Sequence, residues 1–184
     1  MRTLRQPGPV TPSRRDAIAG AASGQFRLVL APGFDLLHGI RDALLAHGVT
    51  DAAISLASGS LDRLSYMTGM ADASGARVAT YGAPTVLEGP VAVVAGNAFL
   101  GRDRSGQLGN GPIVHCHAVV VDRAGAIHGG HIVPGACLVG AEGVTLWVTA
   151  LERAGFAAEY DAETNYPIFR PVALAARAGV KAAE

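Results

Sequence analysis

Residues 113–133 read IVHCHAVVVDRAGAIHGGHIV, and they indicate a β-hairpin from which the rest of the fold can be worked out. Two apolar runs flank the segment DRAG at 122–125. Asp at its first position and Gly at its fourth are typical of a type I turn followed by a left-handed glycine, which closes a three-residue hairpin loop. Such a loop pairs Asp122 with Ala126 and sets the register of the two strands.

Counting outward from that pair places three histidines on one face of the hairpin. His117 lies opposite His131, and His115 shares this face because side chains alternate along a strand. Directly opposed Cβ atoms are about 4.5–5.5 Å apart and diagonal ones about 7–8 Å, so three imidazoles can converge on one ion. A two- or four-residue loop would shift the register by one residue and put His128 on that face instead.

A metal site and a ligand-free polar cluster are the two interpretations of this face. Neutral imidazoles packed together in a half-buried sheet leave ring nitrogens unsatisfied unless an ion or water holds them. We therefore favour a metal ion, with Zn²⁺ the best match to imidazole ligands and Fe, Ni, Co or Cu as alternatives. A fourth coordination position would be open to water or a small anion. Cys116 is expected to face the core, and Cys137 is a candidate fourth ligand.

The composition of the chain excludes several classes of protein. Of 184 residues, 49% are hydrophobic, which predicts one domain with a substantial core. No apolar run approaches the roughly 18 residues of a membrane-spanning helix, so no membrane segment is expected. Two cysteines, no apolar leader segment and no glycosylation sequon favour the cytoplasm. The hydrolase, zincin and redox motifs G-x-S-x-G, H-E-x-x-H and C-x-x-C are absent.

Short apolar runs broken by Gly and Pro predict an α+β fold with a mainly antiparallel sheet. A strand is expected at 26–31, followed by a helix with Asp35 as its N-cap that ends near His47 and packs its apolar face on the sheet. Further strands are expected at residues 52–57, 61–68, 77–81, 91–99, 113–121, 126–133, 145–151 and 156–160.

Residues 1–24 contain four arginines and one acid, and we expect them to form a flexible arm that also contains several prolines. The net charge of the chain is +0, so an arm of +3 leaves −3 on the remainder. Tight nonspecific DNA binding by the domain itself is therefore not expected, and any weak DNA contact would depend on the arm.

The motifs of the hairpin resemble the plant- and prokaryote-conserved domain family, called PPC or DUF296. H-x-H at 115–117, D-x-x-G at 122–125, G-G-H at 129–131 and P-G at 134–135 match in type and spacing. Parts of residues 33–59, residues 96–97 and the D-x-E-T of 161–164 match as well. The resemblance covers residues 25–172, which are the expected domain, and residues 173–184 form an Ala-rich tail outside it.

The resemblance implies an antiparallel sheet with flanking helices, a homotrimer with sites near the subunit interfaces, and a metal ion at the three histidines. One position departs from the family pattern, because Pro90 stands where a Glu is frequent. Glu88 is close enough in sequence to take its place. The family is associated with DNA binding, but no AT-hook-like R-G-R-P sequence occurs in this chain.

Three functions stay open from the sequence, none with a specific activity. The first is a trimeric metal-binding protein whose open site binds a small molecule, or acts on it as a hydrolase or lyase. The second is a DNA-associated, transcription-related protein, and the third is a scaffold around a structural ion. Candidate side chains beyond the histidines are the acids Glu88, Asp103 and Glu142 near the site and, for phosphate or ligand contact, Arg102 and Arg104.

Overall fold

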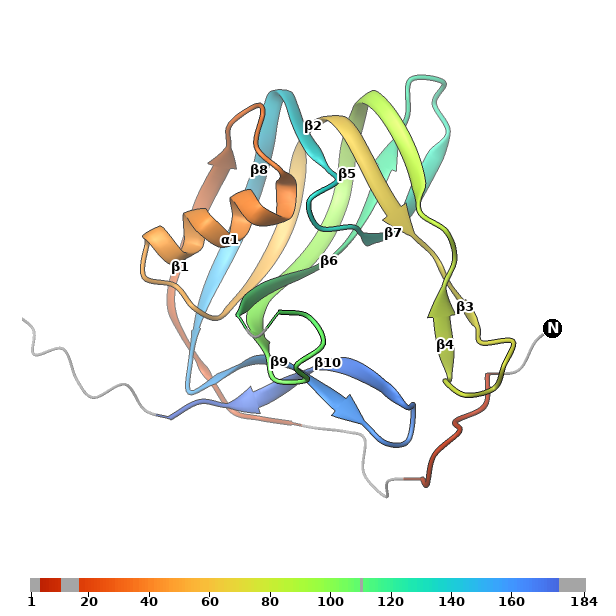
Figure 1. Cartoon of the computed structure of the whole chain (residues 1–184). Coiled ribbons are helices and arrows are strands. Elements are labelled where there is room, and N and C mark those ends of the chain that lie inside the picture. The colour runs from red at the N-terminus through yellow and green to blue at the C-terminus, as the bar shows by residue number, and fades with distance from the viewer. Residues whose placement is uncertain (1–3, 11–16, 110, 176–184) are drawn as a thin grey trace, which may run out of the picture.

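The computed structural model describes residues 4–10, 17–109 and 111–175, which contain one helix and ten strands (Figure 1). The predicted α+β class is confirmed in its broad form. This part of the chain contains the single helix α1 (Leu36–Ala46), which the apolar pattern predicts, whereas the family resemblance implied more than one flanking helix. The strands are β1 (Ala21–Leu30), β2 (Ala52–Met67), β3 (Gly69–Ala71), β4 (Ala79–Tyr81), β5 (Thr85–Asp103), β6 (Pro112–Val121), β7 (Ile127–Ile132), β8 (Leu138–Glu152), β9 (Ala154–Asp161) and β10 (Tyr166–Ala173).

The helix begins and ends where its capping residues predict. The Asp35 side chain accepts a hydrogen bond of 3.0 Å from the backbone N–H of His38, which satisfies one of the free donors of the first turn. At the other end His47 is the C-cap, and Gly48 follows with φ +72°. The buried face of α1 is formed by Leu36, Leu37, Gly39, Ile40 and Leu44.

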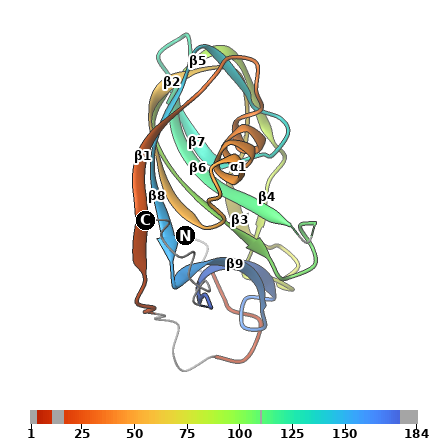
Figure 2. The same cartoon turned by 90° about the vertical axis from the view of Figure 1, so that its left-hand side faces the viewer.

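The main sheet has the strand order β1-β8-β2-β7-β6-β5-β9-β10, and β2 also pairs with β5. The strands β2, β5, β6 and β7 therefore pair in a closed cycle, so this part of the sheet curls into a small barrel. All of these pairings are antiparallel, whereas β5 and β9 pair in parallel. Figure 2 shows α1 on one side of the sheet and β9 at one end of it.

Two expected strands are joined in the structure. The runs at 52–57 and 61–68 form the single strand β2, because register shifts at Leu56/Ser58, Gly59/Leu61 and Leu61/Arg63 absorb the polar residues between them. Gly59 has φ +136°, and a Cβ there would collide with the backbone of Gly143. Glycine is thus needed at this close approach of two strands.

The strand β10 was not expected, because Pro167 and Pro171 weaken its strand signal. It is the last strand in the order of the sheet, where proline is tolerated since one edge needs no partner. At the other end of the chain, β1 starts at Ala21, inside the segment expected as the arm. Residues 1–3 and 11–16 of that arm and residues 176–184 of the expected tail lie outside the described residues. The described part of the chain has no helix long and apolar enough to cross a membrane.

Candidate metal centre

The turn between β6 and β7 has the predicted geometry. The backbone N–H of Asp122 donates to the carbonyl of Ala126 at 3.0 Å, and Gly125 has φ +80°. The Asp122 carboxylate accepts hydrogen bonds of 2.9 Å from the backbone N–H groups of Ala124 and Ala126. The predicted three-residue loop is therefore confirmed, together with the register that it sets.

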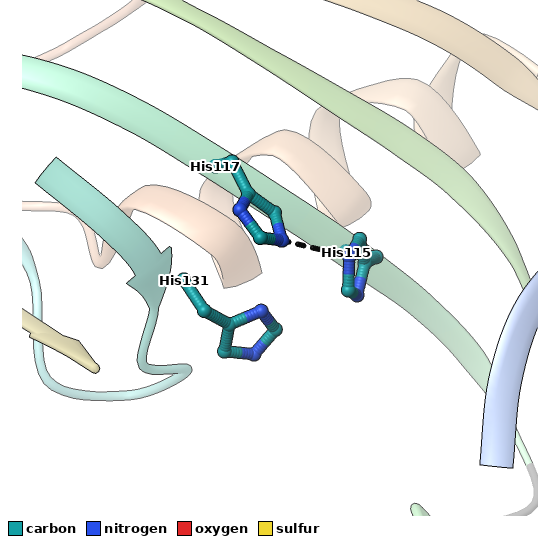
Figure 3. Close-up of side chains that lie close together, drawn as sticks. All are labelled: His115, His117 and His131. Atoms are coloured by element: carbon teal, nitrogen blue, oxygen red, sulfur yellow. Dashed lines mark hydrogen bonds between the residues drawn. The ribbon is translucent and has the colours of Figure 1, made fainter. Parts of the chain in front are cut away.

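That register brings three histidines together. His117 is paired directly with His131, and one ring nitrogen from each of these two and one from His115 all lie within 4.8 Å of one another. Figure 3 shows the three rings pointing toward one another, two from β6 and one from β7. The Nε2 atoms of His115 and His117 are 3.1 Å apart. Two nitrogens on a tetrahedral Zn²⁺ are about 3.3 Å apart, given Zn–N bonds of about 2.0–2.1 Å.

The chemistry of this cluster of three histidines fits a transition-metal ion. The Nδ1 atom of His131 is buried and has no hydrogen-bond partner. Burial, and after it the neighbouring histidines, lower the pKa of His115 and of His131 to about 4. Both imidazoles are therefore neutral at pH 7, which is the form that binds metal ions.

Aromatic rings enclose the cluster on its cavity side. Tyr81 of β4 stacks on His131 with ring centroids 4.9 Å apart, and Phe169 of β10 stacks on His115 at 5.4 Å. Burial raises the pKa of Tyr81 above its usual value, so its hydroxyl stays protonated at neutral pH. Sequence analysis missed both rings, because they lie on strands far from the hairpin in the chain and share no spacing with it.

His128 faces away from the cluster and belongs to the turn. Its Nε2 is 2.9 Å from the Asp122 carboxylate, and its Nδ1 is 3.1 Å from the hydroxyl of Tyr66. The hydrogen bond from His128 is the largest cause that lowers the pKa of Asp122. The prediction that His128 lies off the three-histidine face is confirmed, since β6 and β7 pair Val120 with His128.

Two glycines before His131 are required by the sheet. A Cβ on Gly129 would be 2.6 Å from the carbonyl oxygen of Ala118. A Cβ on Gly130 would collide with the carbonyl oxygen of Met67. The strand β7 thus comes unusually close to both β6 and β2, which only residues without a side chain allow.

The two cysteines are buried and outside the cluster. Cys116 faces the core as expected, and burial raises its pKa to about 12. The Cys137 thiol donates to the carbonyl oxygen of Ser65 at 3.4 Å, and burial raises its pKa to about 11. A protonated thiol bound to the backbone is a poor metal ligand, so the structure does not support Cys137 as the fourth ligand.

The three candidate acids are not brought to the histidines. Glu88 is exposed and forms a long ion pair of 3.7 Å with Arg63. The Asp103 carboxylate accepts hydrogen bonds from the loop that follows β5, and Glu142 is exposed on β8. Among the described residues the cluster contains no carboxylate.

The two candidate arginines are already paired with acids. Arg102 holds the Asp51 carboxylate at 2.8 Å, and the side chain of Asp51 is only 1% exposed. Arg104 pairs with Glu159 on β9 at 3.2 Å. Arg102 therefore ties β5 to the residue before β2, and Arg104 ties the segment after β5 to β9. Neither arginine lines the cavity beside the histidines.

That cavity has a volume of about 950 Å³ and is bordered by His115 and His131. Its other walls include parts of α1, β4, β5, the first half of β6 and the β9–β10 hairpin, together with residues of the segment between β5 and β6. The volume lies in the range of small-molecule sites, about 300–1,000 Å³.

Solved structures share this fold at low sequence identity. A metal-containing protein from Archaeoglobus fulgidus is similar with a TM-score of 0.63 and 18% identity, over 85% of this chain and 99% of that chain. A plant- and prokaryote-conserved protein from Pyrococcus horikoshii is similar with a TM-score of 0.61 and 15% identity, over 90% of this chain and 100% of that chain. A Ralstonia eutropha protein provisionally named as DNA-binding is similar with a TM-score of 0.58 and 16% identity, over 78% of this chain and 89% of that chain. No curated protein matches the sequence significantly.

A family model described as the Plants and Prokaryotes Conserved (PCC) domain matches residues 18–148. The matched region contains α1, the β6–β7 hairpin and all three clustered histidines. The resemblance found in the sequence is thereby confirmed, and the chain belongs to the Plants and Prokaryotes Conserved (PCC) domain family.

Proposed function

We propose that this protein binds one Zn²⁺ or similar divalent transition ion per chain through His115, His117 and His131. The observation that carries the proposal is the buried Nδ1 of His131, which has no hydrogen-bond partner. One ring nitrogen from each of the three histidines nevertheless lies within 4.8 Å of the other two. Leaving a buried polar atom unpaired costs about 1–3 kcal/mol, and a metal ion removes that cost. The metal-containing relative from Archaeoglobus fulgidus supports this assignment.

The ligand set favours a site for binding a small molecule. Three protein ligands leave a position for water or for an atom of a ligand, and a bound ion would supply Lewis acidity there. The histidines hold the ion, while Tyr81 and Phe169 stack on two of them and limit access of water from the cavity. Hydrolase or lyase chemistry is the second candidate, because a carboxylate that could act as general base is missing from the cluster in the described part of the chain.

We also propose that the protein is a cytoplasmic homotrimer with the metal near the subunit interface. One row of paired residues crosses six strands on the outer face of the sheet. It consists of Arg27, Trp147, Ser55, Asn97, His117 and His131. Trp147 in this row is 55% exposed, and His117 is exposed as well. A partner subunit on this face would cover the tryptophan and one side of the metal site together.

DNA binding is a further candidate, because the relative from Ralstonia eutropha carries that provisional name. The folded part of the chain carries more acids than bases, and Arg102 and Arg104 are held in ion pairs. Any phosphate contacts would therefore come from the arginines of the arm, and binding would be weak and salt-dependent.

The test is the metal content of purified full-length protein, measured by plasma mass spectrometry together with chain concentration. We expect about one ion per chain in the natural protein and in the control His128→Ala, since His128 is bound in the turn. The variants His115→Ala, His117→Ala and His131→Ala should lose the ion while their circular dichroism stays unchanged. A natural protein without a transition metal after growth with zinc, or a His131→Ala variant that retains it, would refute the proposed site.

A further inference from the structure

The cavity beside the histidines differs from the rest of the molecule in its charge. None of the described residues that line it is Asp or Glu, whereas Arg41 and Arg77 add positive charge to the lining. His38 lines it as well, and the two clustered histidines at its border are neutral. The whole chain, by contrast, has as many acids as bases. A concave site lined by one sign of charge concentrates ligands of the opposite sign.

Of the two arginines in the lining, Arg77 has the charge that is less compensated by a neighbouring acid. The guanidinium of Arg41 is bound to the Asp42 carboxylate at 2.8 Å, so its charge is largely compensated. The guanidinium of Arg77 lies instead over the ring of Tyr166, 5.5 Å from its centroid. The neighbouring Asp72 carboxylate accepts hydrogen bonds from Ser74 and from the Arg77 backbone N–H. These bonds, with a smaller contribution from the Arg77 charge, lower the pKa of Asp72, so Asp72 compensates the guanidinium only in part.

The cavity offers a ligand an apolar wall as well. Five aromatic side chains line it, and three of them form a row of neighbouring rings. The ring centroids of Phe99 and Phe156 are 4.4 Å apart with the rings tilted, and Phe156 stacks on Phe169 at 5.9 Å. Phe169 in turn stacks on His115. The aromatic wall therefore leads directly to the histidine cluster.

We propose that this cavity binds an organic carboxylate with an aromatic or similarly flat apolar body. Arg77 attracts the carboxylate, and the row of phenylalanines holds the body, since carboxylate recognition by guanidinium and contact with aromatic rings are the two interactions that the lining provides. This proposal deepens the proposed function. It rests on that function in one respect, because a metal ion on the histidines would add positive charge to the same wall of the cavity.

The test uses three probes of matched structure on the full-length protein as purified. Benzoate carries both the ring and the charge, benzyl alcohol carries the ring alone, and acetate carries the charge alone. Calorimetric titration should show benzoate binding about tenfold or more tightly than either of the others. Only benzoate can interact with the Arg77 guanidinium and with the phenylalanine rings at the same time. Equal affinity for benzoate and benzyl alcohol would refute anion recognition, and equal affinity for benzoate and acetate would show an unspecific anion effect and refute the proposal.

The residue-level control compares Arg77 with Arg123, which is exposed in the β6–β7 turn. Arg77→Gln should lower the affinity for benzoate about tenfold and leave that for benzyl alcohol unchanged. Arg77→Lys should restore part of the affinity, whereas Arg123→Gln should have no effect. Identical results for Arg77→Gln and Arg123→Gln would overturn the role of Arg77, provided that circular dichroism shows both to be folded.

Metal content separates this inference from the proposed function. If the protein holds its ion but binds no benzoate at millimolar concentration, the cavity proposal fails and the metal site stands. If the protein holds no ion and still binds benzoate in an Arg77-dependent manner, the metal assignment fails and the anion cavity stands.

Discussion

The carboxylate of Asp122 binds the imidazole of His128 at 2.9 Å, across the turn that sets the register of the histidine pair. One carboxylate thus caps two backbone N–H groups of the loop and holds the first residues of β7 in place. The three-histidine face depends on this turn. If the register of β7 against β6 shifted by one residue, His131 would move to the opposite face and its neighbours in the chain would take its place.

Replacing Asp122 should weaken the fold in a pH-dependent way. The pKa of Asp122 is lowered in the folded state, so its ionised form contributes stability above the ordinary pKa of 3.8, and this stability is lost as the pH falls through the lower folded value. Asp122→Asn should therefore have a lower urea midpoint than the natural protein at pH 7, and the two midpoints should converge as the pH falls below the folded-state pKa of Asp122. Arg123→Ala, next to it in the turn, is the control and should change neither midpoint.

Adding a methyl group at Gly130 should destabilise the protein by about 1–3 kcal/mol, because the new Cβ collides with the backbone oxygen of Met67. Gly24→Ala is the matched control, since no atom lies within 4 Å of a Cβ at that position. Urea unfolding monitored by circular dichroism measures both changes. Equal stability of the two variants would contradict the close approach of β7 and β2.

The thiols should be unreactive in the folded protein. Burial raises the pKa of Cys116 from 9.0 to about 12 and that of Cys137 to about 11. Because the thiolate is the reactive form, the rise for Cys116 alone lowers its thiolate fraction at pH 8 roughly a thousandfold. Labelling with a disulfide reagent should be slow in buffer and complete in 8 M urea. Rapid labelling of Cys137 in buffer would show that it is open to solvent.

Trp147 should be required for assembly. A charged residue at this exposed position places an unpaired charge in the proposed subunit interface, so Trp147→Asp should be a monomer in light scattering at micromolar concentration, while the natural protein is a trimer. Phe34→Asp changes a similarly exposed apolar residue in the segment between β1 and α1, outside the six strands of this row, and should remain trimeric. A natural protein that is monomeric would refute the assembly itself.

DNA binding should disappear without the first sixteen residues. This truncation removes four arginines and leaves β1 intact, since β1 begins at Ala21 and pairs with β8. The natural protein should bind duplex DNA weakly with a steep salt dependence, and the truncated protein should not bind at physiological salt while keeping its metal. Retained binding to a defined duplex would place the DNA surface on the domain.

The sequence alone determined those features that depend on neighbouring residues. The cap at Asp35, the glycine of the turn at Gly125 and strict alternation along β6 fixed the helix and the pairing of His117 with His131, because turn chemistry and side-chain alternation act over a few residues. The same local rules could not foresee β10, since its prolines weaken a strand unless that strand lies at the edge of a sheet.

Only the tertiary structure decided what surrounds the histidines. Sequence proximity suggested Glu88, Asp103 and Glu142, yet the sheet places all three outside the cluster and brings Tyr81 and Phe169 from distant strands onto the imidazoles. The strand order determines which residues meet across a sheet, and that order results from packing of the whole core, which no short segment of the chain encodes.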